Sequence, residues 1–228
     1  MKTAAALSLA LLLSLPGCAL TSKADPLTIR YFAPVWPDGS RAPSRPSADG
    51  PRLRLGRVSS SSHLRSRIVY RPSDVEIAMY EDRRWTEKPE EYVRRALAHA
   101  LFEARPIVRA VSGVGPELEV ELLAFDEVHR KNGRAARVTL HYAVQDGRTV
   151  LESESMTMEV EVRGDPEDPE NMAASMGAAL RGIAEKLASR VAARLPVGGA
   201  GDASAQASAV GAPDGAAPKA EQQPRAVP

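Results

Sequence analysis

The sequence contains one cysteine, Cys18, among its 228 residues. A chain with a single cysteine forms no internal disulfide, so packing and hydrogen bonds alone must stabilise its folded part. A dominant charge is also lacking, because 30 basic and 29 acidic residues give a formal net charge of +1. This balance provides no electrostatic argument for an acidic substrate, and we expect no nucleic-acid partner. After the N-terminal segment, no apolar run reaches the roughly 20 residues that a transmembrane helix needs.

The sequence also lacks a recognisable catalytic constellation. Its four histidines form no close pair, and no HExxH or cysteine-containing metal pattern follows Cys18. The serine run at 59–62 lacks the glycine frame of a nucleophile elbow. Three alternating glutamates, Glu117, Glu119 and Glu121, are more typical of a solvated strand face than of a catalytic carboxylate pair. We therefore predict that the protein is not an enzyme and has no metal site.

The first residues have the layout of a signal for export. Lys2 gives a short basic start, and the apolar run at 4–15 that follows is too short to span a bilayer. Gly17 directly before Cys18 is typical of a bacterial lipoprotein signal, in which the cysteine becomes the acylated first residue of the mature protein. We therefore predict a signal peptide at 1–17 and covalent acyl chains on Cys18. The alternative is an ordinary secreted protein with one free thiol.

The residues on either side of the cleavage point refine this prediction. Pro16 departs from the small residues that are usual at its position. Ala19 stands where an aspartate would favour retention in the inner membrane of many Gram-negative bacteria, so we expect attachment to the outer membrane, facing the periplasm. Each buried methylene contributes roughly 0.8 kcal/mol, so two or more acyl chains hold a protein firmly at the bilayer. Residues 18–26 would then form the lipid anchor and tether.

Composition divides the rest of the chain into one domain and a tail. Residues 27–196, about 170 positions, suit a single domain with a sizeable core. Within them, the proline-rich stretch at 34–51 predicts a long surface connection. Residues 197–228 are dominated by Ala, Gly, Pro, Ser and Gln. Such a segment cannot bury enough apolar surface to offset its ordering entropy, so we predict a disordered tail.

Segments rich in branched and aromatic residues predict several strands before the first helix. These segments lie at 27–33, 53–58, 67–71 and 75–80. A helix is predicted to begin near Lys88, because Pro89 fits the first helical position and two glutamates follow it. Apolar residues from Val93 to Ala104 recur at helical spacing and would form one buried face.

The second half of the domain predicts an antiparallel meander followed by a long helix. Three strands are expected at 117–128, 134–145 and 148–162, with reversals at Asn132-Gly133 and Asp146-Gly147. Asp168 and Pro169 would open the last helix, whose apolar stripe continues to Leu195. This order of elements predicts an α+β fold, a single-domain sandwich in which two amphipathic helices pack on one face of a largely antiparallel sheet.

One region combines a LxLGxV strand, an I-V-Y-R strand, and a tyrosine and a tryptophan shortly before the first helix. These features are found at 53–58, 68–71, Tyr80, Trp85 and Pro89. Together with the lipoprotein signal and the closing amphipathic helix, they resemble the ABC-type transport auxiliary lipoprotein family. The resemblance extends over residues 53–195.

This resemblance implies an outer-membrane lipoprotein that works with an ABC permease, its ATPase and an Mce-domain protein. The system would move lipids or other apolar compounds across the periplasm. The motif marks Tyr70, Arg71, Tyr80 and Trp85 as a candidate partner interface, since Tyr, Trp and Arg are enriched in binding hot spots. The alternative role is structural, with Trp85 packed at the helix entrance and Arg71 paired with a nearby carboxylate.

Two other functions are compatible with these residues. The first is an assembly or regulatory lipoprotein of a different envelope complex. The second is a periplasmic carrier that encloses a lipid, which predicts an apolar cavity inside the sheet and helices. The protein would dock onto the Mce assembly through an exposed face of its sheet, either as a single subunit or as a homo-oligomer such as a ring. The sequence leaves the number of subunits open.

Overall fold

The computed structural model describes residues 26–35, 50–113 and 115–195. The predicted signal peptide, the lipid-attachment residue Cys18 and the tail at 197–228 lie outside the described residues, as does most of the proline-rich stretch. Within the described part of the chain, no helix combines the length and the hydrophobicity that a membrane span requires.

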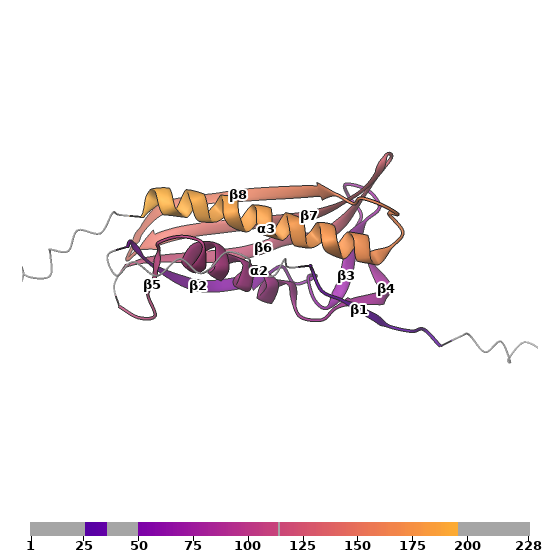
Figure 1. Cartoon of the computed structure of the whole chain (residues 1–228), viewed down its shortest axis with the longest axis horizontal. Helices are drawn as coiled ribbons and strands as arrows, with labels where there is room; N and C mark the ends of the chain where they lie inside the picture. The colour runs from indigo at the N-terminus through magenta and orange to yellow at the C-terminus, as the bar shows by residue number, and fades with distance from the viewer. Residues whose placement is uncertain (1–25, 36–49, 114, 196–228) are drawn as a thin grey trace, which may run out of the picture.

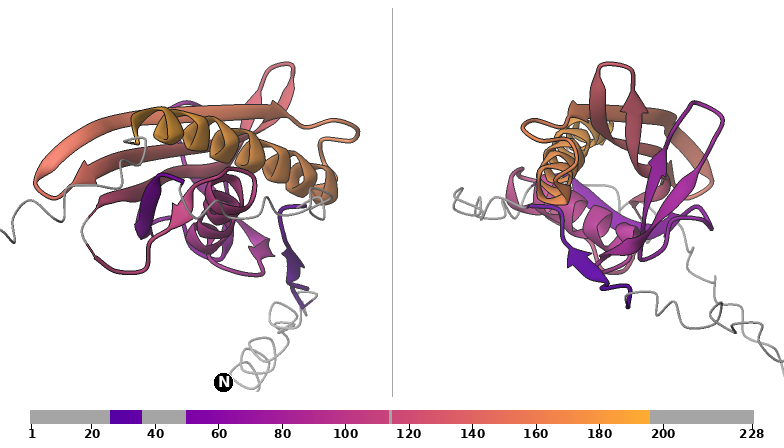
Figure 2. Two further views of the ribbon diagram at one scale, coloured as in Figure 1. Left: turned by 60° about the vertical axis from the view of Figure 1, so that its left-hand side comes forward. Right: turned by 90° about the vertical axis from the view of Figure 1, so that its right-hand side faces the viewer.

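Eight strands form one mixed sheet, and two helices pack on one of its faces (Figure 1). The strands are β1 (Arg30–Phe32), β2 (Arg52–Ser60), β3 (Arg67–Arg71), β4 (Ala78–Trp85), β5 (Val108–Arg109), β6 (Pro116–Arg130), β7 (Gly133–Asp146) and β8 (Thr149–Glu161). The helical elements are α2 (Pro89–Ala98), the π-helical turn η1 (His99–Glu103) and α3 (Pro169–Arg194). Viewed along the long axis, the sheet curves around the helices (Figure 2). This arrangement confirms the predicted α+β sandwich.

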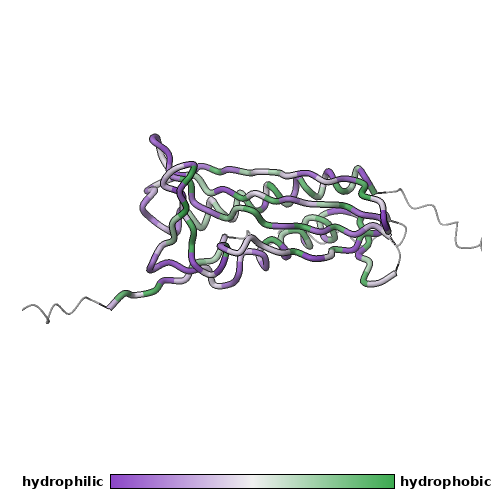
Figure 3. Tube along the Cα trace, turned by 180° about the vertical axis from the view of Figure 1, so that it is seen from behind, coloured by the Kyte–Doolittle hydropathy of each residue, from purple (hydrophilic) through white to green (hydrophobic). Residues whose placement is uncertain are grey.

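The meander of β6, β7 and β8 is antiparallel, as the alternating sequence predicts. Both turns differ by one residue from the prediction. Arg130 pairs with Gly133, so the first two-residue loop is Lys131-Asn132 rather than Asn132-Gly133. Asp146 pairs with Thr149, so the second is Gly147-Arg148 rather than Asp146-Gly147. Gly147 has a φ of 58°, and a glycine in the first loop position is typical of a hairpin turn that accommodates the strand twist. Seen from behind, hydrophobic and hydrophilic residues alternate along the long strands (Figure 3).

The other edge of β6 is shared by two parallel partners. β2 pairs with the first half of β6, and β3 pairs with residues Asp126 to Val128 further along. Both run in the direction of β6, so together they act as one interrupted strand. β4 continues the sheet antiparallel to β3, and β1 pairs in parallel with β4. These parallel pairs were not predicted.

The fourth predicted strand, at 75–80, is displaced towards the C-terminus. The strand begins at Ala78 and ends at Trp85, five residues beyond the predicted end at Tyr80. Val75 is 95% exposed and Ile77 is 43% exposed, so their branched side chains lie in the turn before β4 instead of covering the core. The strand is defined instead by pairing of its backbone with β3 and β1.

The helices begin where the sequence predicts, but the first one changes geometry. Pro89 is the first residue of α2, and Asp168 caps α3 by accepting a hydrogen bond from the backbone N–H of Glu170 at 2.9 Å. The backbone N–H of Ala104 donates to the carbonyl oxygen of His99 at 3.0 Å, which is the i to i+5 bond of a π-helix. The two helices and the facing side of the sheet bury one contiguous hydrophobic cluster.

Candidate interaction site

Two adjacent carboxylates lie fully buried in the middle of the sheet. Asp126 and Glu127 are both 0% exposed and follow each other in β6. Because successive side chains of a strand point to opposite faces, each carboxylate needs its own partners. A buried charge is tolerated only when it is paired and hydrogen-bonded, and different arginines meet this need on each face.

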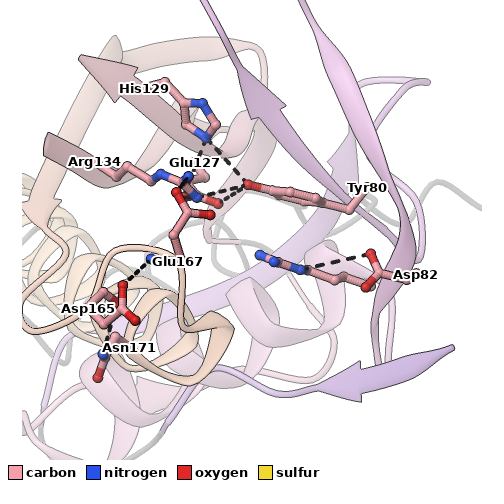
Figure 4. Close-up of polar contacts among 9 residues, drawn as sticks. Tyr80, Asp82, Glu127, His129, Arg134, Asp165, Glu167 and Asn171 are labelled. Atoms are coloured by element: carbon pink, nitrogen blue, oxygen red, sulfur yellow. Dashed lines mark hydrogen bonds and ion pairs between the residues drawn. The ribbon is translucent and has the colours of Figure 1, made fainter. Parts of the chain in front are cut away.

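Glu127 is held by a group of residues that we call the tyrosine cluster: Tyr70, Tyr80, Glu127, His129 and Arg134. The Tyr80 hydroxyl donates to Glu127 Oε2 at 2.9 Å, and Arg134 Nη1 donates to Oε1 at 3.0 Å (Figure 4). His129 Nε2 lies 3.5 Å from Oε1 of the same carboxylate. Arg134 also contacts Glu167, in the loop before α3. The cluster therefore links β3, β4, β6 and β7 to that loop.

Aromatic rings cover the carboxylate. The ring centroids of Tyr70 and Tyr80 are 4.4 Å apart, and those of Tyr70 and His129 are 5.1 Å apart. The guanidinium of Arg83 lies over the Tyr80 ring at 4.2 Å from its centroid, a distance at which a cation is attracted to the ring face. These side chains are only half-buried. The cluster thus presents ring surfaces at the outside of the protein while its charges are satisfied inside.

The environment fixes the protonation of the cluster. Burial raises the pKa of the Tyr80 hydroxyl above its usual range, and the neighbouring Glu127 carboxylate adds to the rise. Tyr80 therefore remains a hydrogen-bond donor at neutral pH. Burial also lowers the pKa of His129, although Glu127 acts in the opposite direction. The ring is consequently neutral at pH 7, and its contacts do not depend on a second positive charge.

Asp126 is held on the other face by two arginines. Arg71 Nε donates to Asp126 Oδ2 at 2.8 Å. Arg137 makes two bonds to the same carboxylate, from Nε at 3.0 Å and from Nη2 at 2.9 Å. Arg71 thus pairs with a nearby carboxylate, and it fixes β3 against β6. It does not share a face with the tyrosines.

Trp85 lies in the core, away from the cluster. It is 1% exposed, and its ring meets Tyr92 and Phe125 edge-on at centroid distances of 6.2 and 5.2 Å. Tyr92 belongs to the first turn of α2, so the tryptophan packs at the helix entrance. Of the four residues singled out in the sequence, the structure brings together Tyr70 and Tyr80. It separates them from Arg71 and Trp85.

Sequence reasoning did not identify Glu127, His129 or Arg134 as members of a site. The available signal was the pair of acidic residues inside an otherwise apolar strand segment, Ala124 to Val128. Two adjacent carboxylates in a buried strand require a cationic partner on each face. The sequence does not say which of its many arginines supply the partners.

The described residues contain no group of three or more His, Cys, Asp or Glu side chains that could hold a metal ion. A pocket of about 440 Å³ lies between α2, η1 and α3, beside Tyr92, His99 and Leu180. Its charged side chains pair with each other, as in the contact of 2.9 Å between His99 and Glu103. None of the residues of the tyrosine cluster lines this pocket.

Comparison with known proteins identifies the family. A family model described as the ABC-type transport auxiliary lipoprotein component matches residues 37–188. A crystal structure of a protein from Xanthomonas campestris is similar, with a TM-score of 0.59 and 16% identity, and the match covers 72% of this chain and 95% of that one. A crystal structure of an uncharacterized protein has a TM-score of 0.54 at 16% identity, with 72% and 99% covered. No curated protein matches the sequence.

The two structural matches show the fold alone, whereas the family match also shows to which family the chain belongs. It covers more than half of the chain and includes every element from β2 to most of α3. Both strands of the motif and the residues of the tyrosine cluster lie within it. The chain therefore belongs to the ABC-type transport auxiliary lipoprotein family, which makes it a membrane-anchored, non-catalytic component of such a transport system.

Proposed function

We propose that the protein is an outer-membrane lipoprotein whose acyl chains are attached to Cys18 and whose domain faces the periplasm. It would dock onto the Mce-domain protein of an ABC transporter that moves lipids or other apolar compounds across the envelope. The permease and the ATPase would be separate chains. The observation that carries the proposal is the half-exposed ring surface of the tyrosine cluster, held rigid by a buried ionic network.

Rigidity supports an interface role for this surface. Tyr70 and Tyr80 are positioned by ring contacts and by the bond to Glu127, so little side-chain entropy would be lost when a partner binds. Tyr70 and Tyr80, with Arg83 over the Tyr80 ring, are residue types that are enriched in binding hot spots.

The two remaining interface candidates would act through the position of the strands. Arg71 fixes β3 through Asp126, and Trp85 fixes the end of β4 against α2. Both strands carry a tyrosine of the cluster. Loss of either residue would therefore weaken partner binding by moving Tyr70 or Tyr80.

The packing of the core favours docking over a carrier function. Side chains from the sheet and from both helices pack against one another in one hydrophobic cluster. A carrier would need to open this cluster to enclose a lipid. Mass spectrometry of the purified protein for co-purifying lipid separates these two functions.

The interface is tested by pull-down of the Mce-domain protein with Tyr70→Ala and Arg71→Ala variants. The matched control is Val150→Ser, because Val150 is 58% exposed on β8, away from the cluster. Circular dichroism verifies the fold of each variant. We expect the Tyr70→Ala and Arg71→Ala variants to lose binding while the control retains it. Normal binding by a well-folded Tyr70→Ala variant would show that the partner docks elsewhere.

The anchor is tested separately by labelling cells with a clickable fatty acid. We expect label on the wild type and none on Cys18→Ser, with the labelled protein in the outer-membrane fraction of a density gradient. An unlabelled wild type, or label that survives the substitution, would exclude Cys18 as the attachment site.

A further inference from the structure

β1 and the residues before it carry a row of uncovered apolar side chains. Leu27 is 59% exposed, Ile29 is 44% and Tyr31 is 63%. They occupy alternate positions of β1 and the described residues just before it, and alternate side chains point to the same side where the backbone is extended. We call these three residues the β1 row. Isolated exposed apolar residues need no explanation, but an aligned set marks a surface that another apolar phase covers.

The neighbouring residues Arg30 and Phe32 show in which direction the β1 row points. Phe32 is only 9% exposed, and it pairs in register with the buried Trp85. The Arg30 guanidinium lies 5.1 Å from the centroid of the Phe32 ring and 3.9 Å from Glu170, at the start of α3. Phe32 and Arg30 thus face the helices. The β1 row therefore points away from them, and Figures 1 and 2 show β1 at the margin of the molecule, projecting from the body.

The length of chain before the row limits its distance from a lipid anchor. Leu27 follows Cys18 by nine positions. A fully extended chain advances at most about 3.6 Å per residue, so Leu27 lies within roughly 32 Å of an acylated Cys18, and Tyr31, 13 positions after it, lies within roughly 47 Å. Of all the described elements, the segment that leads into β1 follows the anchor most directly. The bilayer is thus the nearest large apolar phase to these three side chains.

We infer that the β1 row docks the domain onto the lipid surface beside the anchor, and this inference rests on the proposed acylation of Cys18. Leu27 and Ile29 would enter the boundary between headgroups and acyl chains. The Tyr31 ring suits the same depth, because its apolar body favours the acyl side while its hydroxyl stays in the polar layer. The acyl chains supply the affinity, and the row sets the orientation. Docking on this side of β1 leaves the helix-facing side of the domain turned towards the periplasm.

The depth of the β1 row in the membrane is measured with nitroxide labels. The full-length mature lipoprotein is placed in vesicles of phosphatidylethanolamine and phosphatidylglycerol. Because Cys18 is the only cysteine and its thiol is acylated, each introduced cysteine carries the only free thiol. Labels are placed by Ile29→Cys and Tyr31→Cys in the row. Thr28→Cys on the other side of the segment and Val111→Cys, at a site that is 87% exposed, serve as controls. Power saturation then compares collisions with oxygen, which partitions into lipid, and with a water-soluble nickel chelate.

We expect the labels at 29 and 31 to collide more with oxygen than with the chelate, and the labels at 28 and 111 to do the reverse. Labels at 29 and 31 that behave like the label at 111, in protein whose mass shows acylated Cys18, would overturn docking but leave the anchor intact. A mature protein without acyl chains would overturn both proposals. Spin–spin broadening between labels at 29 or 31 would overturn lipid docking by showing that a second copy covers the row.

Discussion

Substitutions around Asp126 should show that the cost of losing an arginine depends on what remains to neutralise the buried carboxylate. Asp126 is 0% exposed, whereas the side chains of Arg71 and Arg137 are 18% and 21% exposed. An arginine that loses its partner can turn towards water. The carboxylate cannot, so the penalty is concentrated on the acidic residue.

The magnitude follows from the number of bonds that each arginine makes. Arg71 donates one hydrogen bond to Asp126, and Arg137 donates two. A hydrogen bond to a charged group contributes about 1.5–3 kcal/mol, so we expect Arg71→Ala to lower the free energy of unfolding by about that amount. Arg137→Ala leaves the carboxylate with a single bond. Breaking a buried ion pair costs roughly 3–5 kcal/mol, which we expect for this variant.

A double variant distinguishes an unpaired charge from a simple loss of packing. Asp126→Asn in the Arg137→Ala background removes the charge, keeps the shape of the side chain and still accepts a bond from Arg71. We therefore expect it to be more stable than Arg137→Ala alone, although it carries one more substitution. Urea unfolding followed by far-UV circular dichroism measures each free energy. Arg57→Ala, at an exposed position on the same sheet, is the surface control and should change stability by less than about 0.5 kcal/mol.

If Arg71→Ala and Arg137→Ala lowered the free energy of unfolding by the same amount, the number of hydrogen bonds to Asp126 would not determine the cost. A double variant less stable than Arg137→Ala would refute the explanation by buried charge, because the effects would then be those of two independent packing losses.

Three further predictions concern pH and packing. Burial lowers the pKa of His129 in the folded protein. The stability that the neutral ring contributes is therefore complete above the pKa of the unfolded chain, about 6.5, and is lost as the pH falls through the folded-state pKa. The urea midpoint should drop between pH 7 and pH 5 in the wild type and drop less in His129→Gln. Burial raises the pKa of Tyr142 to about 12, so stability should decline as the pH rises above about 10, and an alkaline titration of Tyr142→Phe should show a smaller decline. A Cβ at Gly177 would lie 2.1 Å from the carbonyl oxygen of Val35, whereas at Gly182 it would meet only the flexible end of Met158 at 3.2 Å. Thermal unfolding should therefore show that Gly177→Ala is destabilised and that Gly182→Ala is neutral or up to about 1 kcal/mol more stable, and equal effects would contradict the close packing of α3 on the segment after β1.

The long elements could be predicted because each carries its own periodic signal. In β7, Val138, Leu140 and Tyr142 are buried and alternate with more exposed neighbours, so the strand can be recognised without knowledge of its partners. The capping residues of α3 are equally local. The position of β4, in contrast, cannot be predicted from its own residues. Its last residues are mostly charged, and they form a strand because β1 and β3 supply the hydrogen bonds.

The forked edge of the sheet could not be predicted for a related reason. β6 has 15 residues, which is long enough to pair with two short strands placed end to end. Nothing in the sequence of β2 or β3 specifies a parallel partner, because the choice depends on the fit along β6. The π-helical turn at His99–Glu103 is a similar case. Its residues keep helical spacing, so the pattern predicts an uninterrupted helix.

The candidate site shows where local reasoning ends. The motif drew attention to Tyr70 and Tyr80, which lie side by side in the structure, but not to the Glu127 carboxylate that joins Tyr80 to the rest of the sheet. Tyr80 is 47 positions from Glu127, and Arg71 is 55 positions from Asp126. Burial of two adjacent acids requires a cation on each face of the sheet, and that requirement is readable in the sequence. The strand register then selects the partners. Successive side chains of β3 point to opposite faces, and the parallel register with β6 sets Tyr70 opposite Glu127 and brings Arg71 within bonding distance of Asp126. One tyrosine and one arginine that are neighbours in the chain thereby meet different carboxylates, on opposite faces of the sheet.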